Sequence, residues 1–216
     1  MSDDFVNEVS HNVEIFRLFF VVVLLTAFGL SGYFRRQARR SGESIARSRE
    51  GAGNLFLRLL LAVPFYLSML AYAVNPGWMA WSAVALPTWL RWVGVIAGLA
   101  TLPLLYWVFR SLGNNISETF LTKEKHGLVT HGPYQWVRHP LYTVASAAFL
   151  ALGLIAANGF ILIMGAVILV GIALFVVPKE EAQLTVKFGE SYLEYRRRTG
   201  GLMPRLKKSG QWSVVF

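Results

Sequence analysis

Residues 94–109 read GVIAGLATLPLLYWVF and form the centre of one of five apolar runs that together decide the fold class. The runs cover residues 15–34, 55–74, 93–112, 141–157 and 160–177. An α-helix rises about 1.5 Å per residue, so about 20 apolar residues cross the hydrocarbon core of a bilayer, which is roughly 30 Å thick. The sequence therefore predicts an all-α, polytopic membrane protein with about five transmembrane helices.

The composition agrees with a membrane protein and excludes several classes of site. Of the 216 residues, 55% are hydrophobic and only 15% are charged, against about 25% charged in soluble domains. The net charge of +9 comes from basic residues at the ends of apolar runs, which are typical topology signals, so we expect no nucleic-acid partner. The sequence has no cysteine, which excludes disulfides, thiolate metal sites and a cysteine nucleophile.

Two local features refine the reading of the apolar runs. The last two runs are separated only by Asn158 and Gly159, a pair that favours a sharp turn, so we predict a tight helical hairpin. The first run follows an acidic stretch, whereas a cleavable signal peptide needs a basic start. We therefore interpret residues 15–34 as a transmembrane helix.

The distribution of basic residues predicts the orientation in the membrane. All but two of the 21 Lys and Arg residues fall on one side of the predicted spans, and the exceptions are Arg17 and Arg91. The positive-inside rule makes the basic side cytoplasmic, with the N-terminus outside and a cytoplasmic, amphipathic helix near the C-terminus. Four tryptophans in residues 75–92 are interpreted as an interfacial aromatic belt. The absence of cysteine and of a retention signal favours a bacterial inner membrane.

The first segment that could carry chemistry is HGLVTHGPYQWVRHPLY, residues 126–142. Pro140 suits the first turn of a helix, which places Arg138 and His139 at a helix N-terminus, where free N–H groups and the helix dipole attract a carboxylate or phosphate. Aromatic faces are offered nearby by Tyr134, Trp136 and Tyr142. Alternatively, Arg138 only reaches lipid headgroups and His139 only caps the helix.

The second such segment is KEEAQLTVKFGESYLEY, residues 179–195. Its larger apolar residues are spaced by four, four and three positions, which predicts one stripe of an amphipathic helix formed by Leu184, Phe188, Tyr192 and Tyr195. Glu180 shares this stripe and is expected to face the protein or the membrane, whereas Glu181 is about 100° away and is expected to be solvated. No cluster of His or carboxylate residues has metal-ligand spacing, so we predict no metal site.

The ordered combination LVTHGPYQWVRHPLY, an apolar hairpin, EE, FGESYLEYRRR and Pro204 resembles the isoprenylcysteine carboxyl methyltransferase family and its phospholipid methyltransferase relatives. The resemblance covers about residues 113–204. It implies an integral membrane methyltransferase that uses S-adenosyl-L-methionine. Residues 1–216 would then form one membrane domain, with an N-terminal three-helix part (1–112), a cofactor-binding core (113–204) and a C-terminal tail (205–216).

The resemblance also implies roles for individual residues. Catalytic roles fall on Arg138, His139 and Glu180. The cofactor-binding residues would be His126, Gly127, Leu128, Val129, Tyr134, His139, Pro140, Leu141, Tyr142 and Glu180. Prenylcysteine methyltransferases carry an arginine for the substrate carboxylate at the position of Val176, so we expect a different acceptor, small or lipidic, at the cytoplasmic face of the membrane.

Two other functions are consistent with the same residues. A sterol-reductase-like membrane oxidoreductase would bind NADPH and could hold its 2′-phosphate with Arg196, Arg197 and Arg198. A non-enzymatic, lipid-binding membrane protein would need no cofactor pocket and would tolerate the loss of Glu180.

Overall fold

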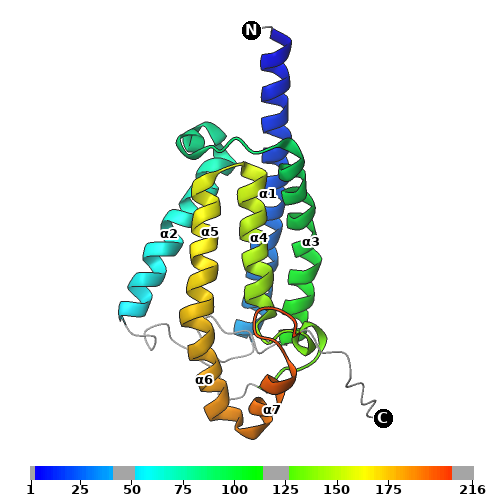
Figure 1. Cartoon of the computed structure of the whole chain (residues 1–216), viewed down its shortest axis with the longest axis vertical. Coiled ribbons are helices and arrows are strands. Elements are labelled where there is room, and N and C mark those ends of the chain that lie inside the picture. The colour runs from blue at the N-terminus through cyan, green and yellow to red at the C-terminus, as the bar shows by residue number, and fades with distance from the viewer. Residues whose placement is uncertain (1–2, 41–51, 114–126, 206–216) are drawn as a thin grey trace.

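The computed structural model describes residues 3–40, 52–113 and 127–205, and these residues form seven α-helices with no β-strand. The prediction of an all-α fold is confirmed. The helices, drawn in Figure 1, are α1 (Asp3–Arg40), α2 (Ala52–Val74), α3 (Thr88–Leu112), α4 (Pro140–Ala156), α5 (Gly159–Gly171), α6 (Val177–Phe188) and α7 (Glu190–Arg198). Short 3₁₀ turns, η2 (Pro76–Ser82) and η4 (Gly132–Gln135), precede α3 and α4.

The helices have the length and composition of an integral membrane protein. Three stretches are long and apolar enough to cross a bilayer: Asn12–Arg40, Thr88–Leu112 and Gly159–Phe188. Two shorter apolar helices, Leu59–Val74 and Pro140–Ala156, accompany them. The membrane class is therefore confirmed, and the count of five spans stays a prediction.

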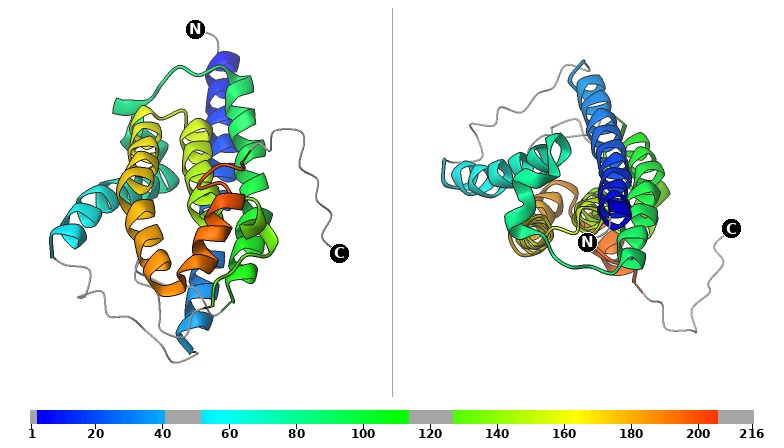
Figure 2. Two further views of the ribbon diagram at one scale, coloured as in Figure 1. Left: turned by 60° about the horizontal axis from the view of Figure 1, so that its bottom comes forward. Right: turned by 90° about the horizontal axis from the view of Figure 1, so that it is seen from above.

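Helices α1, α3 and α4 pack together, and α5 runs back beside α4 while α2 lies at the outside of the bundle (Figures 1 and 2). Glycines allow the closest approaches. A Cβ atom added to Gly94 of α3 would lie 2.8 Å from the Cβ atom of Leu154 in α4. A Cβ atom on Gly153 would lie 2.7 Å from the side chain of Leu162 in α5. Small residues are the usual means of close helix packing in membranes, because they bring more atoms into van der Waals contact.

The hairpin predicted at Asn158 and Gly159 is confirmed. Ala157 ends α4 in the left-handed conformation with φ of 48°. The Asn158 side chain caps α5 by accepting a hydrogen bond from the Ile161 backbone N–H at 3.1 Å. Its amide also donates to the Met79 carbonyl at 3.0 Å, so this one side chain fixes the turn and joins it to η2.

The C-terminal helices differ from the expectation in two ways. The helix of the fifth apolar run continues past residue 177, because α5 leads through a π-helical turn (Ile172–Val176) directly into α6. The single amphipathic helix predicted from Leu184 to Tyr195 is wrong, because Gly189 adopts φ of 55° and separates α6 from α7. A positive φ is readily adopted by glycine, which allows α7 to turn back beneath the bundle (Figure 1).

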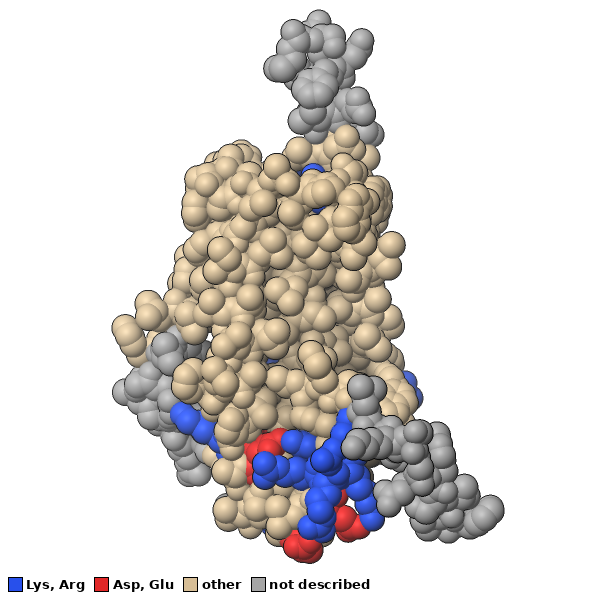
Figure 3. Space-filling view, viewed as in Figure 1, with Lys and Arg blue, Asp and Glu red and all other residues tan. Residues whose placement is uncertain are grey.

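The two ends of the bundle differ in charge. Lys and Arg side chains gather at the end formed by α6 and α7 (Figure 3). At the opposite end, Arg17 donates to the carbonyls of Ala73 and Val74, which terminate α2, at 3.0 and 2.6 Å. Arg91 donates twice to the Ile155 carbonyl near the end of α4, at 3.1 and 2.9 Å. The two basic residues that depart from the topology pattern therefore satisfy carbonyl groups at helix C-termini.

Candidate functional site

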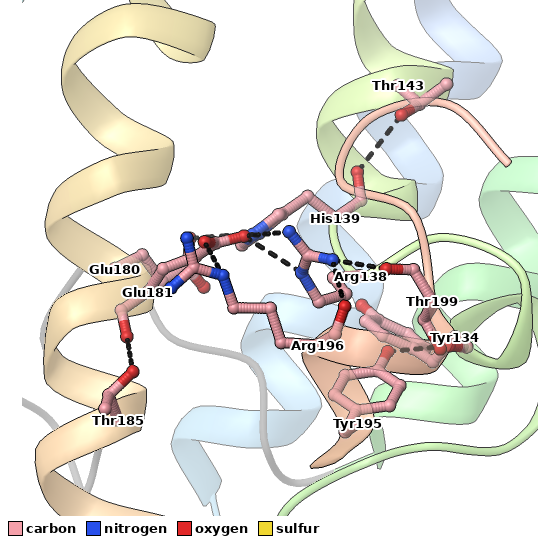
Figure 4. A network of polar contacts seen from close by, with 10 residues as sticks. All are labelled: Tyr134, Arg138, His139, Thr143, Glu180, Glu181, Thr185, Tyr195, Arg196 and Thr199. Carbon is pink, nitrogen blue, oxygen red and sulfur yellow. Dashed lines mark hydrogen bonds and ion pairs between the residues drawn. The ribbon is translucent and has the colours of Figure 1, made fainter. Parts of the chain in front are cut away.

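Three segments distant in the sequence meet at the charged end: the start of α4, the start of α6, and the stretch after α7 (Figure 4). We call this last stretch, residues 199–202, the C-terminal strap. The backbone N–H of Arg138 donates to the Gly200 carbonyl at 2.8 Å, and the Thr143 hydroxyl donates to the Leu202 carbonyl at 2.7 Å. A Cβ atom on Gly200 would lie 1.9 Å from the Met203 carbonyl oxygen, so the strap requires glycine there.

Arg138 and Glu181 form the centre of the site. The guanidinium donates from Nε and Nη2 to one carboxylate oxygen, Oε1 of Glu181, at 2.9 and 2.6 Å. Its Nη1 donates to the carbonyls of Thr199 and Arg196, the latter at 3.2 Å. Only 12% of the Arg138 side chain is exposed. The sequence assigned this arginine to an incoming anion, and the structure shows it bound within the protein.

The expectation that Glu181 is solvated is wrong. Its side chain is only 10% exposed, and its second oxygen, Oε2, lies 3.4 Å from Nε of Arg196. Glu181 contacts Arg138 and His139, which precede α4, and Arg196 of α7, and none of these neighbours can be seen in helix periodicity alone. A buried carboxylate needs compensating charge, which Arg138 supplies here.

His139 lies between two carboxylates. Its Nε2 is 3.3 Å from Oε1 of Glu181, and its Nδ1 is 3.7 Å from Oε2 of Glu180. The ring is 3% exposed and stacks on the Tyr142 ring, with centroids 5.9 Å apart. His139 is therefore held on three sides, and the edge that carries Nδ1 faces Glu180.

Glu180 is the least satisfied group of the cluster. Its side chain is 28% exposed, yet its Oε2 atom is buried and has no hydrogen-bond partner among the described residues. The Tyr142 side chain interacts with this carboxylate. Since an unpaired buried acceptor is costly, Oε2 is suited to accept a hydrogen bond from a bound molecule.

Tyrosines close the site from the side of α7. The Tyr195 hydroxyl donates to the Tyr134 carbonyl at 2.6 Å and so ties α7 to η4. Burial raises the pKa of the Tyr195 phenol, and burial together with the nearby Glu180 carboxylate raises the pKa of Tyr134. Burial also raises the pKa of Tyr192 to about 12. All three phenols are consequently neutral at physiological pH and can act as hydrogen-bond donors.

The structure brings together six of the residues expected from the sequence: Tyr134, Arg138, His139, Pro140, Tyr142 and Glu180. Leu141 instead packs against the apolar cluster that contains Phe34 and Phe109. Gly127 is exposed, Leu128 and Val129 are half-buried, and His126 lies outside the described residues. The sequence interpretation missed Glu181, Tyr195 and the C-terminal strap. The adjacent glutamates were the only signal for Glu181, and they do not reveal which one is buried.

The comparison that decides the family concerns the part of the chain that holds this cluster. The sequence model of the family described as phospholipid methyltransferase matches residues 78–191, more than half of the chain. This chain belongs to the phospholipid methyltransferase family. The matched region begins in η2 and includes His139, Glu180 and Glu181. The expected relationship to membrane methyltransferases is thereby confirmed.

The chain is also similar to two individual proteins. The cobalt-zinc-cadmium resistance protein CzcN of Cupriavidus metallidurans is 32% identical over 133 residues, which are 57% of this chain. The match spans 60% of that relative's length. A solved structure of a eukaryotic intramembrane Ras methyltransferase, an isoprenylcysteine carboxyl methyltransferase, matches with a TM-score of 0.49 and 22% identity, over 74% of this chain and 54% of that one.

Proposed function

We propose that this protein transfers a methyl group from S-adenosyl-L-methionine to a small or lipidic acceptor at the cytoplasmic face of the membrane. The observation that carries the proposal is the Glu180 carboxylate beside His139, whose Oε2 atom is buried without a hydrogen-bond partner among the described residues. Membership of the phospholipid methyltransferase family supports the reaction class.

The chemistry of the donor fits the groups around Glu180. S-adenosyl-L-methionine carries hydroxyl and ammonium donors, which the Oε2 atom of Glu180 can accept. Its positive charge and its adenine suit the neutral aromatic rings of Tyr134 and Tyr142. Its carboxylate needs a cation. Arg138 is bound internally, so we assign this contact to Arg196, whose side chain is 53% exposed at the edge of the network.

The bound donor would supply a methyl group already activated by its sulfonium. The protein then has to hold the reactants in line and exclude water, and it needs little acid–base machinery. Glu180 and the two tyrosines bind the donor in this scheme. Arg138 acts as a positioning residue, because it joins α4, α6 and the C-terminal strap without reaching outward. The site lies at the end where Lys and Arg gather (Figure 3), which the positive-inside rule assigns to the cytoplasm.

The acceptor class follows from the helix above the site. Val176 lies in the π-helical turn that precedes Glu180, and it offers no charge to a substrate carboxylate. Leu174 and Phe175 in the same turn are 62% and 59% exposed, so this surface is apolar and suited to lipid chains. We therefore favour an acceptor with an apolar part and without a free carboxylate.

The reductase alternative receives less support from the arginines. Arg197 pairs with Glu190 at 2.7 Å, Arg198 pairs with Glu194, and Arg196 lies beside Glu181. A 2′-phosphate at Arg197 or Arg198 would have to compete with a carboxylate that already pairs with the arginine.

The test is methyl transfer in reconstituted vesicles. Purified protein is incubated with S-adenosyl-L-methionine labelled in its methyl group and with vesicles of bacterial lipid extract. We expect label in the organic phase for the wild type and none for Glu180→Gln. Binding of NADPH and of S-adenosylhomocysteine to the same preparation is measured by calorimetric titration. Binding of NADPH together with absence of S-adenosylhomocysteine binding would overturn the proposal in favour of the reductase.

A further inference from the structure

We infer that Glu181 is a positioning residue that holds His139 as the tautomer protonated on Nε2, so that the unprotonated Nδ1 atom is the one turned toward Glu180. The inference concerns a residue outside the set that the sequence assigned to the site. The effect of Glu181 on donor binding rests on the proposed function, whereas the tautomer of His139 does not.

The hydrogen bonds of Glu181 determine its ionisation state. Its Oε1 atom accepts from Nε and Nη2 of Arg138 at 2.9 and 2.6 Å. Both are charge-assisted hydrogen bonds to an always-protonated guanidinium. A protonated carboxyl would place a hydrogen where two donors already point. Glu181 is therefore an ionised acceptor in this arrangement.

The ionised Glu181 carboxylate in turn determines which ring nitrogen of His139 carries the proton. The same Oε1 atom lies 3.3 Å from Nε2 of His139. Because an ionised carboxylate can only accept, Nε2 must carry the hydrogen of this bond. The opposite ring atom, Nδ1, is 3.7 Å from Oε2 of Glu180, which is too long for a hydrogen bond. A neutral imidazole carries a single N–H, so a proton on Nε2 leaves the lone pair on Nδ1.

The orientation of the His139 ring affects the proposed binding site of the methyl donor. The His139 ring is 3% exposed and is wedged against Tyr142, so it has little freedom to turn once Nε2 is held. Its Nδ1 atom and the Glu180 carboxylate lie next to each other, 3.7 Å apart (Figure 4). Without the hydrogen bond to Glu181, the His139 ring can rotate, and Nδ1 is no longer held beside Glu180. Glu181 thus acts on donor binding through His139.

The geometry of Glu181 predicts which substitution preserves this arrangement. All three bonds from Arg138 and His139 go to Oε1, whereas Arg196 lies near Oε2. In Glu181→Gln, the donors of Arg138 fix the amide oxygen at the Oε1 position. His139 then still meets an acceptor. In Glu181→Ala, no acceptor remains at that position.

The test is nitrogen NMR of protein labelled with ¹⁵N-histidine, in detergent, without ligand and at alkaline pH. The His139 signals are assigned by comparison with His139→Asn. We expect a protonated Nε2 and an unprotonated Nδ1 in the wild type and in Glu181→Gln, and a mixture of tautomers in Glu181→Ala. A ring protonated on Nδ1 in the wild type, or on both nitrogens, would overturn the inference, and so would an unchanged spectrum for Glu181→Ala.

Titration with S-adenosylhomocysteine supplies the second readout. We expect the dissociation constant to rise about tenfold or more for Glu181→Ala and to stay within about threefold for Glu181→Gln. Equal affinities for the wild type and Glu181→Ala would contradict the positioning role. If Glu181→Ala does not fold, the wild-type and Glu181→Gln spectra still decide the tautomer. If the wild type binds no S-adenosylhomocysteine, the proposed function fails, and the spectra still judge the tautomer independently.

Discussion

Among the residues that the structure describes, both ends of the molecule bury arginine side chains against backbone carbonyls, but only the charged end combines them with buried carboxylates. At the tryptophan-rich end, Arg91 donates to the Ile155 carbonyl and lies over the Phe16 ring, 3.8 Å from its centroid. At the charged end, Arg138 donates to carbonyls and also to Glu181. The first arrangement is complete by itself, because it only ends a helix. The second continues through His139 to Glu180, where an acceptor atom remains unpaired among the described residues. A buried arginine is therefore poor evidence for a site, whereas an unpaired carboxylate oxygen beside it is good evidence.

Loss of Arg138 should have the largest effect on the charged end. In Arg138→Met, the Glu181 carboxylate stays buried and loses its two shortest bonds. Breaking one partner of a buried ion pair costs about 3–5 kcal/mol, so we expect a marked fall in the thermal unfolding temperature in detergent. The double variant Arg138→Met/Glu181→Leu should regain part of this stability, because no unpaired charge remains. An unchanged unfolding temperature in the single variant would show that the network does not hold the segments together.

Loss of Arg91, at the tryptophan-rich end, should lower stability without affecting ligand binding. In Arg91→Met, the Ile155 carbonyl loses its two hydrogen bonds from the guanidinium. A hydrogen bond to a charged group contributes about 1.5–3 kcal/mol to the free energy of unfolding. We expect a lower unfolding temperature and an unchanged dissociation constant for S-adenosylhomocysteine, measured at a temperature where the variant is folded. Weaker binding in this variant would contradict the assignment of the site to the charged end alone.

Loss of Arg196 should have the smallest effect on stability and a specific effect on binding. Its side chain is 53% exposed, and its contact with Glu181 is 3.4 Å long, so Arg196→Gln should change the unfolding free energy by less than about 1 kcal/mol. We expect S-adenosylhomocysteine affinity to fall about threefold to tenfold, and its dependence on salt to weaken. The control is Arg198→Gln, which removes a surface pair with Glu194 and should leave binding unchanged. Equal affinity in the two variants would remove the carboxylate contact assigned to Arg196.

The apolar runs predicted most of the fold, because a span of about 20 apolar residues has few alternatives to a helix in lipid. The turn at Asn158 was also predictable, since its residues determine the local geometry. The continuation of α5 into α6 was not, because the π-helical turn Ile172–Val176 leaves no mark in hydropathy. The break at Gly189 could have been suspected, but regular apolar spacing on both sides of it suggested one helix.

The candidate site was predictable as a set of segments and not as a set of contacts. His139 and Glu180 were identified, and the structure places them 3.7 Å apart. The burial of Glu181 and the inward direction of Arg138 depend on the start of α6 lying beside the residues that precede α4, and on the strap that supplies the carbonyls of Thr199 and Gly200. These are tertiary contacts between residues more than forty positions apart, which periodicity within one helix cannot show.

The measurement that tests the central claim most directly is calorimetric titration with S-adenosylhomocysteine of the wild type, Glu180→Gln and Glu190→Gln. The last variant is a matched control, because Glu190 is a 73% exposed surface residue paired with Arg197. We expect saturable binding by the wild type and the control, and a loss of tenfold or more, about 1.4 kcal/mol, for Glu180→Gln. The unfolding temperature of Glu180→Gln should be unchanged or higher, because the substitution replaces a partly buried carboxylate whose Oε2 atom accepts no hydrogen bond among the described residues. Wild-type affinity in Glu180→Gln would contradict the account, since the unpaired carboxylate oxygen would then have no part in binding the donor.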